Sequence, residues 1–303
     1  MLSIDAAHLN FSQDSLWVLN ICLAIIMFGV ALDIKWVDFK NVFEAPKAAF
    51  VGLLLQFVLL PAASFLLVLI IQPAPSIALG MMLVAACPGG NISNFITHLS
   101  KGNTALSVSL TSLGTLLALV MTPLNLEVWG SLYPPTAAIL TEVSLDPWEV
   151  FKTICVLIGI PLVIGMTMSQ RYPIIASRIS KRVKPISILI FAIFVIVAFA
   201  NNVDAFTEYI HLVVLVVFIH NLTALSLGYY VAKLFGLSKE NRKTLAIETG
   251  IQNSGLGLVL IFGFFQGLGG MAIVAGWWGI WHILSGLAIA SFWARSAPST
   301  QTI

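Results

Sequence analysis

Charged residues are scarce in this chain of 303 residues, where Asp, Glu, Lys and Arg together make up only 9%. A soluble domain typically contains about 25% of them. Hydrophobic residues make up 59%, and the mean hydropathy is +0.99. This composition excludes a soluble globular enzyme and a disordered protein. The three cysteines are scattered through apolar stretches, which excludes a disulfide scaffold and gives no metal-binding spacing.

Acidic residues are almost absent from the long apolar runs, and Glu248 is the only one that falls within such a run away from its ends. An intramembrane aspartyl protease would need two aspartates at that depth. A zinc metalloprotease would need His-Glu-x-x-His, which the sequence lacks. The apolar runs are unbroken rather than alternating, which is typical of spanning helices and not of a membrane β-barrel. We therefore predict an all-α polytopic membrane protein.

The apolar runs predict nine transmembrane helices, since each span needs about 20 mostly apolar residues. The predicted ranges are about 15–34, 48–71, 75–99, 104–123, 151–169, 185–202, 209–234, 244–265 and 270–293. The two longest connections are expected at 124–148 and 170–184, and Pro134-Pro135 marks the first of them as a loop. We expect Trp17, Trp148 and the cluster Trp277-Trp278-Trp281 to be interfacial anchors.

The distribution of charge sets the orientation. With nine spans, every basic residue except Lys152 lies on one side of the membrane. The loops of the opposite side contain Asp5, Asp14, Glu127, Glu142, Asp146, Glu149, Asp204 and Glu208. The positive-inside rule then places the N-terminus outside and the C-terminus in the cytoplasm. We expect a multi-pass protein of a bacterial inner (plasma) membrane, with the lipid bilayer as a partner and no nucleic acid.

Two predicted spans are interrupted by polar and helix-breaking residues. The third contains Cys87-Pro88-Gly89-Gly90-Asn91-Ile92-Ser93-Asn94, and the eighth contains Glu248-Thr249-Gly250-Ile251-Gln252-Asn253-Ser254. Proline and glycine unwind a helix, and freed backbone groups at membrane depth must be buried in protein or line a cavity. The two segments therefore predict broken helices that build a polar site.

Glu248 is the main candidate for function, because ionisable residues inside a membrane are costly. An alternative is that it lies near the surface and pairs with Lys243, which is about 7.5 Å away along a straight helix. The nearby amides of Gln252 and Asn253 favour the polar site.

The two interruptions look like counterparts, since Gly90-Asn91-Ile92-Ser93-Asn94 resembles Gly250-Ile251-Gln252-Asn253-Ser254. The five-helix offset pairs helices 1–4 with helices 6–9 in opposite orientations, which is the pattern of an inverted-repeat transporter. Carboxylate, amide, hydroxyl and carbonyl oxygens suit a hard cation such as Na⁺, and exposed N–H groups suit an anion.

These residues resemble the motifs of the bile acid:sodium symporter family, which includes bile acid carriers and bacterial relatives. The matching segments are Cys87-Pro88-Gly89-Gly90 with Ser93-Asn94, Gly102-Asn103, Glu248-x-Gly250-x-Gln252-Asn253-Ser254 and Trp281-His282. The resemblance implies a panel domain (about 15–34 and 151–202) and a core domain (about 48–123 and 209–293). The third and eighth helices would cross at their breaks.

The resemblance also implies two sodium sites and a substrate region. The first sodium site would use Ser93, Asn94, Ser107, Thr111 and Glu248. The second would use Gln56, Glu248 and Gln252 with the backbone carbonyls of Thr249 and Ile251. The substrate region would include Asn91, Asn253 and His282; the family often has threonine at position 91.

The expected function is Na⁺-coupled symport of an organic monoanion, bile-acid-like or pantoate-like, by alternating access. Two Na⁺ ions and one carboxylate leave a local charge of about +1, which a monoanion would neutralise. We therefore expect a transporter and not an enzyme. Three alternatives stay open: a proton-driven transporter of the same fold with Glu248 as carrier, a non-transporting receptor, and a serine hydrolase using Ser254 and His282.

Overall fold

The computed structural model describes residues 4–5, 7, 9, 13–143, 146–200 and 202–295, and all regular elements in these ranges are helices. The first half contains α1 (Gln13–Ala31), α2 (Trp36–Glu44), α3 (Pro46–Leu54), η1 (Leu55–Leu59), α4 (Leu60–Ile71), α5 (Pro75–Ala86), α6 (Ile92–Leu99), α7 (Thr104–Leu132) and α8 (Pro134–Glu142). The second half contains α9 (Pro147–Ile154), η2 (Cys155–Gly159), α10 (Ile160–Arg171), α11 (Pro173–Ala200), α12 (Val203–Leu234), α13 (Lys239–Gly250), α14 (Ser254–Phe264) and α15 (Gly269–Arg295). Both η elements are π-helical.

Prolines begin several helices instead of ending them. α8 begins at Pro134 and α11 begins at Pro173. The first turn of a helix has no partner for the missing N–H, and the fixed φ of proline suits that position. The prediction of loops at 124–148 and 170–184 was therefore wrong. α7 extends to Leu132, α8 fills much of the first segment, and α11 occupies most of the second.

Two long helices contain a π-helical segment just before a proline. η1 precedes Leu60-Pro61, and η2 precedes Ile160-Pro161. A proline inside a helix lacks the N–H donor and its ring clashes with the carbonyl four residues earlier, and a wider turn relieves that clash. Gln56 lies within η1.

Five helical stretches are long and apolar enough to cross a membrane: Pro46–Ile71, Thr104–Leu132, Trp148–Arg171, Phe206–Leu234 and Gly269–Arg295. Asn20–Ala31, Pro75–Ala86 and Ser254–Phe264 are shorter apolar helices. Two of the short helices, α5 and α14, adjoin the interruptions predicted from the sequence. The all-helical membrane fold is confirmed, and the total of nine spans stays a prediction.

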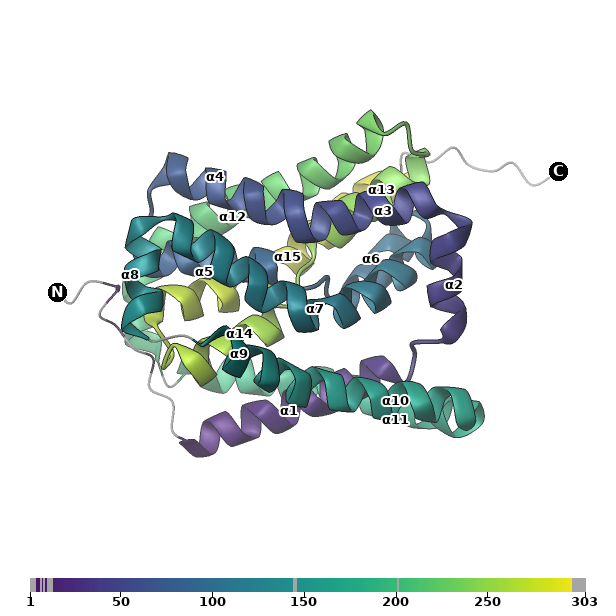
Figure 1. Cartoon of the computed structure of the whole chain (residues 1–303), viewed down its shortest axis with the longest axis horizontal. Helices are drawn as coiled ribbons and strands as arrows, with labels where there is room; N and C mark the ends of the chain where they lie inside the picture. The colour runs from purple at the N-terminus through teal and green to yellow at the C-terminus, as the bar shows by residue number, and fades with distance from the viewer. Residues whose placement is uncertain are drawn as a thin grey trace.

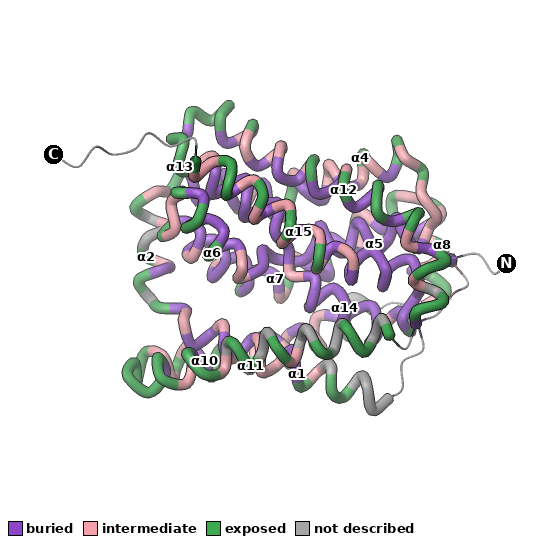
Figure 2. The backbone as a smooth tube through the Cα atoms, turned by 180° about the vertical axis from the view of Figure 1, so that it is seen from behind, coloured by how far each residue is buried: buried purple, intermediate pink, exposed green. Residues whose placement is uncertain are grey.

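The helices form two groups that lie side by side (Figure 1). α1 packs mainly on α10 and α11, whereas α12 packs on α13 and α15, and α5 packs on α15 and α7. Figure 2 shows that buried residues are concentrated along α5, α14 and α15, while α10 and α11 are largely exposed. α2 and α8 lie at opposite ends of the molecule in both views. The interrupted helices therefore lie inside the larger group.

Candidate functional site: two paired helix breaks

Both predicted interruptions are present in the structure. α5 ends at Ala86 and α6 begins at Ile92, while α13 ends at Gly250 and α14 begins at Ser254. Cys87 is extended, with φ −69° and ψ 153°, because the residue before a proline is disfavoured in helical geometry. The chain therefore unwinds at the two places where the sequence contains proline, glycine and amide residues.

The two breaks pair with each other through their backbones. Gly90 N–H donates to Ile251 O at 2.8 Å, and Asn253 N–H donates to Pro88 O at 2.8 Å. Gly89 and Gln252 form an isolated antiparallel β-bridge. These contacts satisfy backbone groups that the unwinding would leave unpaired in an apolar interior. The two broken helices therefore meet at their breaks.

Close approach at this crossing requires glycine. A Cβ on Gly89 would lie 3.2 Å from Glu248 Oε2, and a Cβ on Gly90 would lie 3.1 Å from Gln252 O. Both distances are tight for a methyl group, and the neighbouring backbone is fixed by its own hydrogen bonds. The two glycines therefore let the α5–α6 break lie directly against the carboxylate.

Glu248 is buried and accepts hydrogen bonds from three hydroxyl groups. Its Oε1 accepts from Ser93 at 2.5 Å and also from Ser107, and its Oε2 accepts from Thr111 at 3.0 Å. Ser93 is on α6, Ser107 and Thr111 are on α7, and Glu248 is on α13. Ser107 and Thr111 share one face of α7 because residues four apart in a helix are neighbours.

Asn94 completes the same cluster. Its Oδ1 lies 2.9 Å from Ser107 Oγ and 3.3 Å from Thr111 Oγ1, as an alternative acceptor to Glu248 for the proton of each hydroxyl. The structure therefore brings together all five residues expected for the first sodium site. Each serine or threonine oxygen can donate its proton to the carboxylate or amide and still offer lone pairs to a cation.

Lys243 does not pair with Glu248. Its ammonium donates to Ser100 O at 2.8 Å, at the end of α6. Among the residues that the structure describes, the one salt bridge joins Lys152 and Glu149. The interpretation of Glu248 as a shallow residue paired with Lys243 was therefore wrong.

Gln56 and Gln252 form a second polar cluster beside the first. Gln56 Nε2 donates to Gln252 Oε1 at 2.9 Å and to Cys87 O at 2.8 Å. Gln252 Nε2 donates to Thr249 O at 2.7 Å. Ile251 O lies at the crossing, where it accepts from Gly90. The residues expected for the second sodium site thus also lie close together.

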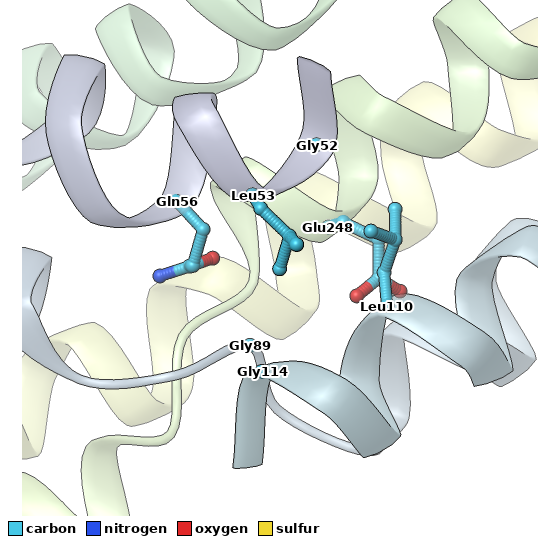
Figure 3. A pocket seen from close by; sticks show the side chains of 7 residues that line it. All are labelled: Gly52, Leu53, Gln56, Gly89, Leu110, Gly114 and Glu248. Carbon is cyan, nitrogen blue, oxygen red and sulfur yellow. The ribbon is translucent and has the colours of Figure 1, made fainter. Parts of the chain in front are cut away.

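A small cavity of about 10 Å³ lies between these two clusters. Its lining comes from η1, α3, α7, α13 and the first break, and consists of Gly52, Leu53, Gln56, Gly89, Leu110, Gly114 and Glu248. Figure 3 shows Gln56 and Glu248 reaching from different helices, with Leu53 between them. This volume is close to what one water-sized particle needs.

The expected substrate residues are less closely grouped. Asn253 accepts from Leu256 N–H at 3.1 Å and so caps α14, whereas Asn91 precedes α6 without a side-chain cap. His282 is buried on α15, and its Nδ1 has no hydrogen-bond partner within the described part of the chain. No hydrogen bond joins Ser254 to His282 among the described residues, so the pair that a serine hydrolase would need is not formed there.

Several polar residues at this depth were missed from the sequence. His220 and Asn221 on α12 are buried, and His220 Nε2 lies 2.6 Å from Ser64 Oγ on α4. Trp278 is fully buried and packs on His220, with ring centroids 4.8 Å apart, so its prediction as an interfacial anchor was wrong. Trp17 and Trp148 are exposed, as such anchors should be. Lone polar residues within apolar runs give little warning of such contacts.

The fold and the site define an all-helical membrane protein in which two interrupted helices meet at an oxygen-lined polar centre. The sequence model of the sodium bile acid symporter family matches residues 20–209. The chain therefore belongs to the sodium bile acid symporter family.

Three relatives illustrate the range of similar proteins. The uncharacterized sodium-dependent transporter YocS of Bacillus subtilis (strain 168) is 32% identical over 97% of this chain and 90% of its own length. The ileal sodium/bile acid cotransporter of Homo sapiens is 30% identical over 79% of this chain and 67% of its own. The probable chloroplastic sodium/metabolite cotransporter BASS1 of Arabidopsis thaliana is 29% identical over 91% of this chain and 66% of its own length. These relatives are transporters, in agreement with the expectation that the chain is not an enzyme.

Proposed function

We propose that this protein is a symporter that couples Na⁺ to the uptake of an organic monoanion by alternating access. In this proposal the α2 end faces the cytoplasm of a bacterial cell and the N-terminus lies outside. The proposal rests above all on one observation: a buried carboxylate, Glu248, accepts from three hydroxyl groups and has no basic partner within the described chain. An unpaired charge at membrane depth is costly, and a bound cation would compensate it.

The donor chemistry favours Na⁺ in the first site. Carboxylate, hydroxyl and amide oxygens are hard ligands, which suit an alkali or alkaline-earth cation better than a thiophilic metal. Glu248 provides the negative charge, and Ser93, Ser107, Thr111 and Asn94 provide neutral oxygens within hydrogen-bond distance of one another. One carboxylate matches the charge of a monovalent cation.

The second Na⁺ site is proposed at Gln56 and Gln252, beside the cavity that Glu248 also lines. The amide oxygens and the carbonyls of Thr249 and Ile251 would replace the hydration shell of the ion. The amides now bond one another, so ion binding would exchange these hydrogen bonds for cation contacts. This exchange couples occupancy of the site to the geometry of both breaks.

The proposed substrate is an organic monoanion, such as a bile-acid-like or pantoate-like carboxylate. The sodium bile acid symporter family and the named activities of the relatives support this class. Two Na⁺ ions and Glu248 leave a net charge of about +1, which one carboxylate neutralises. α6 begins at Ile92 without a side-chain cap, so the positive end of its dipole near Asn91 would favour an anion.

The two groups of helices supply the moving parts of the proposal. α1 and α9–α11 would form the panel, and the helices that contain the breaks would form the core. α11 has few contacts with α12, although the two are consecutive in the chain. Na⁺ would order the crossing, and the panel and core would then move against each other around the bound substrate.

Proton coupling through Glu248 is the second candidate. A proton on Glu248 needs one acceptor, and any of the three neighbouring hydroxyl oxygens could accept its hydrogen bond. A cation needs several oxygen ligands at once, and Ser93, Ser107, Thr111 and Asn94 provide such a set beside the carboxylate. The number of oxygens in the cluster therefore favours the sodium-driven mechanism.

The test is the thermal stability of the purified protein in Na⁺ against K⁺ at constant ionic strength. A ligand that binds only the folded state raises the free energy of unfolding by about 2.7 kcal/mol per site at 100 times its Kd, and the unfolding midpoint rises with it. We expect a Na⁺-specific rise in the wild-type protein and none in Glu248→Gln. The matched variant Glu142→Gln, at an exposed position, should retain the full rise.

An equal midpoint in Na⁺ and K⁺ for the wild-type protein would contradict the sodium sites. If the midpoint instead depends on pH, and this pH dependence is lost in Glu248→Gln, the proton-driven alternative is favoured. Uptake of labelled taurocholate or pantoate into proteoliposomes under a Na⁺ gradient then tests the substrate class.

A further inference from the structure

Asn221 lies at the depth of the crossing, although neither expected sodium site nor the expected substrate region includes it. It is 1% exposed, and its Nδ2 donates to Gly250 O at 2.8 Å. Gly250 is the last residue of α13 and stands between Thr249 and Ile251. The last carbonyls of a helix have no partner within the helix, so a buried amide that binds one of them fixes where the helix ends.

The other end of the Asn221 side chain is tied to α15. Ser285 Oγ donates to Asn221 Oδ1 at 2.6 Å, and Ser285 Oγ also lies 3.2 Å from His282 O. One amide therefore joins the carbonyl end of α13 to the turn of α15 that contains His282. α15 reaches the second break itself, because a Cβ on Gly286 would lie 2.9 Å from Ile251 Cδ1.

The backbone of α12 lies close to α13 next to this contact. A Cβ on Gly228 would lie 2.5 Å from Leu245 O, and a Cβ on Gly250 would lie 2.4 Å from Leu225 Cδ2. Glycine at both positions therefore allows the two helices to approach closely. The Asn221 amide reaches Gly250 O across this close contact.

Gln56 makes the equivalent contact at the first break. Its Nε2 donates to Cys87 O, the residue that follows α5, just as Asn221 Nδ2 donates to the last carbonyl of α13. Each break is thus fixed by one amide from a neighbouring continuous helix. Gln56 also contacts Gln252 in the expected second sodium site, whereas Asn221 contacts Ser285 and through it the helix of His282.

We propose that Asn221 and Ser285 form a positioning pair that fixes the carbonyl end of α13 and links the second Na⁺ site to the substrate side of α15. Neither side chain contacts Na⁺ in this scheme. Their hydrogen bonds set the direction of the Thr249 and Ile251 carbonyls and move with α15 when an anion binds near His282. The inference rests on the proposed sodium-coupled function.

The test is equilibrium binding of radioactive Na⁺ to the purified, folded protein, with the apo unfolding midpoint measured in parallel. Asn221→Leu conserves volume but removes both hydrogen bonds, and we expect it to weaken Na⁺ binding by about tenfold, the effect of one lost hydrogen bond to a fixed polar group. Ser285→Ala removes only the link to α15, and we expect a weakening of about threefold.

Two further variants separate positioning from general stability. Ser285→Thr retains the hydroxyl and should bind Na⁺ with wild-type affinity. Ser64→Ala removes a buried hydroxyl that contacts His220 and not the breaks. It should lower the unfolding midpoint and leave Na⁺ affinity within twofold of the wild type.

The outcomes distinguish this inference from the proposed function. If the wild-type protein binds Na⁺ and both Asn221→Leu and Ser285→Ala bind it equally well, the positioning pair is refuted while the sodium sites stand. If Asn221→Leu does not fold, Ser285→Ala against Ser285→Thr decides the question alone. Absence of Na⁺ binding to the wild-type protein would overturn the proposed function and this inference together.

Discussion

At the scale of single residues, the chemistry of the site comes from neutral side chains around one charge. Ser93, Ser107 and Thr111 would be unremarkable in any membrane helix, where hydroxyl groups commonly bond their own backbone. Here all three turn toward Glu248 instead. The role of these hydroxyl groups depends on the carboxylate, and the free-energy cost of burying the carboxylate depends in turn on their hydrogen bonds.

The two-ion proposal makes a prediction at this scale. Gln56→Leu removes the amide that bonds Gln252 Oε1 and Cys87 O. We expect saturation binding of radioactive Na⁺ to fall from two ions per protein to one. Leaving Cys87 O and Gln252 Oε1 without this donor should also lower the free energy of unfolding by about 1–3 kcal/mol. The exposed Gln170→Leu provides the control, and an unchanged stoichiometry of two would place the second ion elsewhere.

The expected ligands of the first site came as a group from the family resemblance, which rests on compact motifs. Asn94 and Glu248 each lie within a few residues of helix-breaking glycines, so their segments are distinctive. Asn221 and His220 are instead two adjacent polar residues in the apolar run of α12, without a helix-breaking motif. Their partners, Gly250 and Ser64, are 29 and 156 residues away, so no local pattern indicates the contacts.

At the scale of elements, the site depends on how closely helices approach. The isolated bridge between Gly89 and Gln252 joins two segments of the chain that lie between helices. α12 supports the second break from outside, with Gly228 against the backbone of Leu245 and Ala246. Side chains at such positions would separate the helices and pull the Glu248 carboxylate away from the hydroxyl groups.

Two glycine substitutions test this packing. In Gly228→Ala the new methyl group would lie 2.5 Å from Leu245 O and 2.7 Å from Ala246 Cα, and the backbone cannot yield cheaply. We expect the free energy of unfolding to fall by about 1–3 kcal/mol, as for overpacked cores. Gly263 on α14 has no atom within 4 Å of the new Cβ. Gly263→Ala should therefore raise stability by about 0.5–1 kcal/mol through helix propensity.

Thermal unfolding in one detergent measures both variants against the wild-type protein. A Gly228→Ala protein as stable as Gly263→Ala would show that α12 and α13 are free to separate at this point. The Na⁺ response of Gly263→Ala should match that of the wild-type protein, because Gly263 is exposed and lies outside the site.

At the scale of the whole molecule, the position of charge relative to the two ends is the basis of the proposed orientation. The α2 end contains Lys35 and Lys40, and the α8 end contains Glu142 (Figure 1). Since cytoplasmic loops are rich in lysine and arginine, the α2 end is the proposed inner side. A nine-span chain would then expose its two termini on opposite sides of the membrane.

Thiol labelling with a membrane-impermeant maleimide tests this orientation. Thr141→Cys near the end of α8 should react in intact cells, and Lys239→Cys at the start of α13 should react only after the membrane is opened. The wild-type protein is the background control, since Cys22 and Cys87 are buried and Cys155 is half-buried in η2. The reverse pattern of labelling would invert the topology.

The sequence by itself determined the helical membrane class, the positions of both breaks and the importance of Glu248. These features are local, because apolar runs, proline, glycine and a single acidic residue act within one segment of chain. The same local view failed at 124–148 and 170–184, where proline starts helices instead of marking loops. The family resemblance implied that the two breaks cross and that Gln56 and Gln252 share a site. Only the tertiary structure decided which backbone groups of the breaks pair, that Gln56 bonds Gln252 directly across 196 residues and that Asn221 bonds the end of α13. Those contacts depend on which helix faces pack together, and a linear pattern of residues does not contain that information.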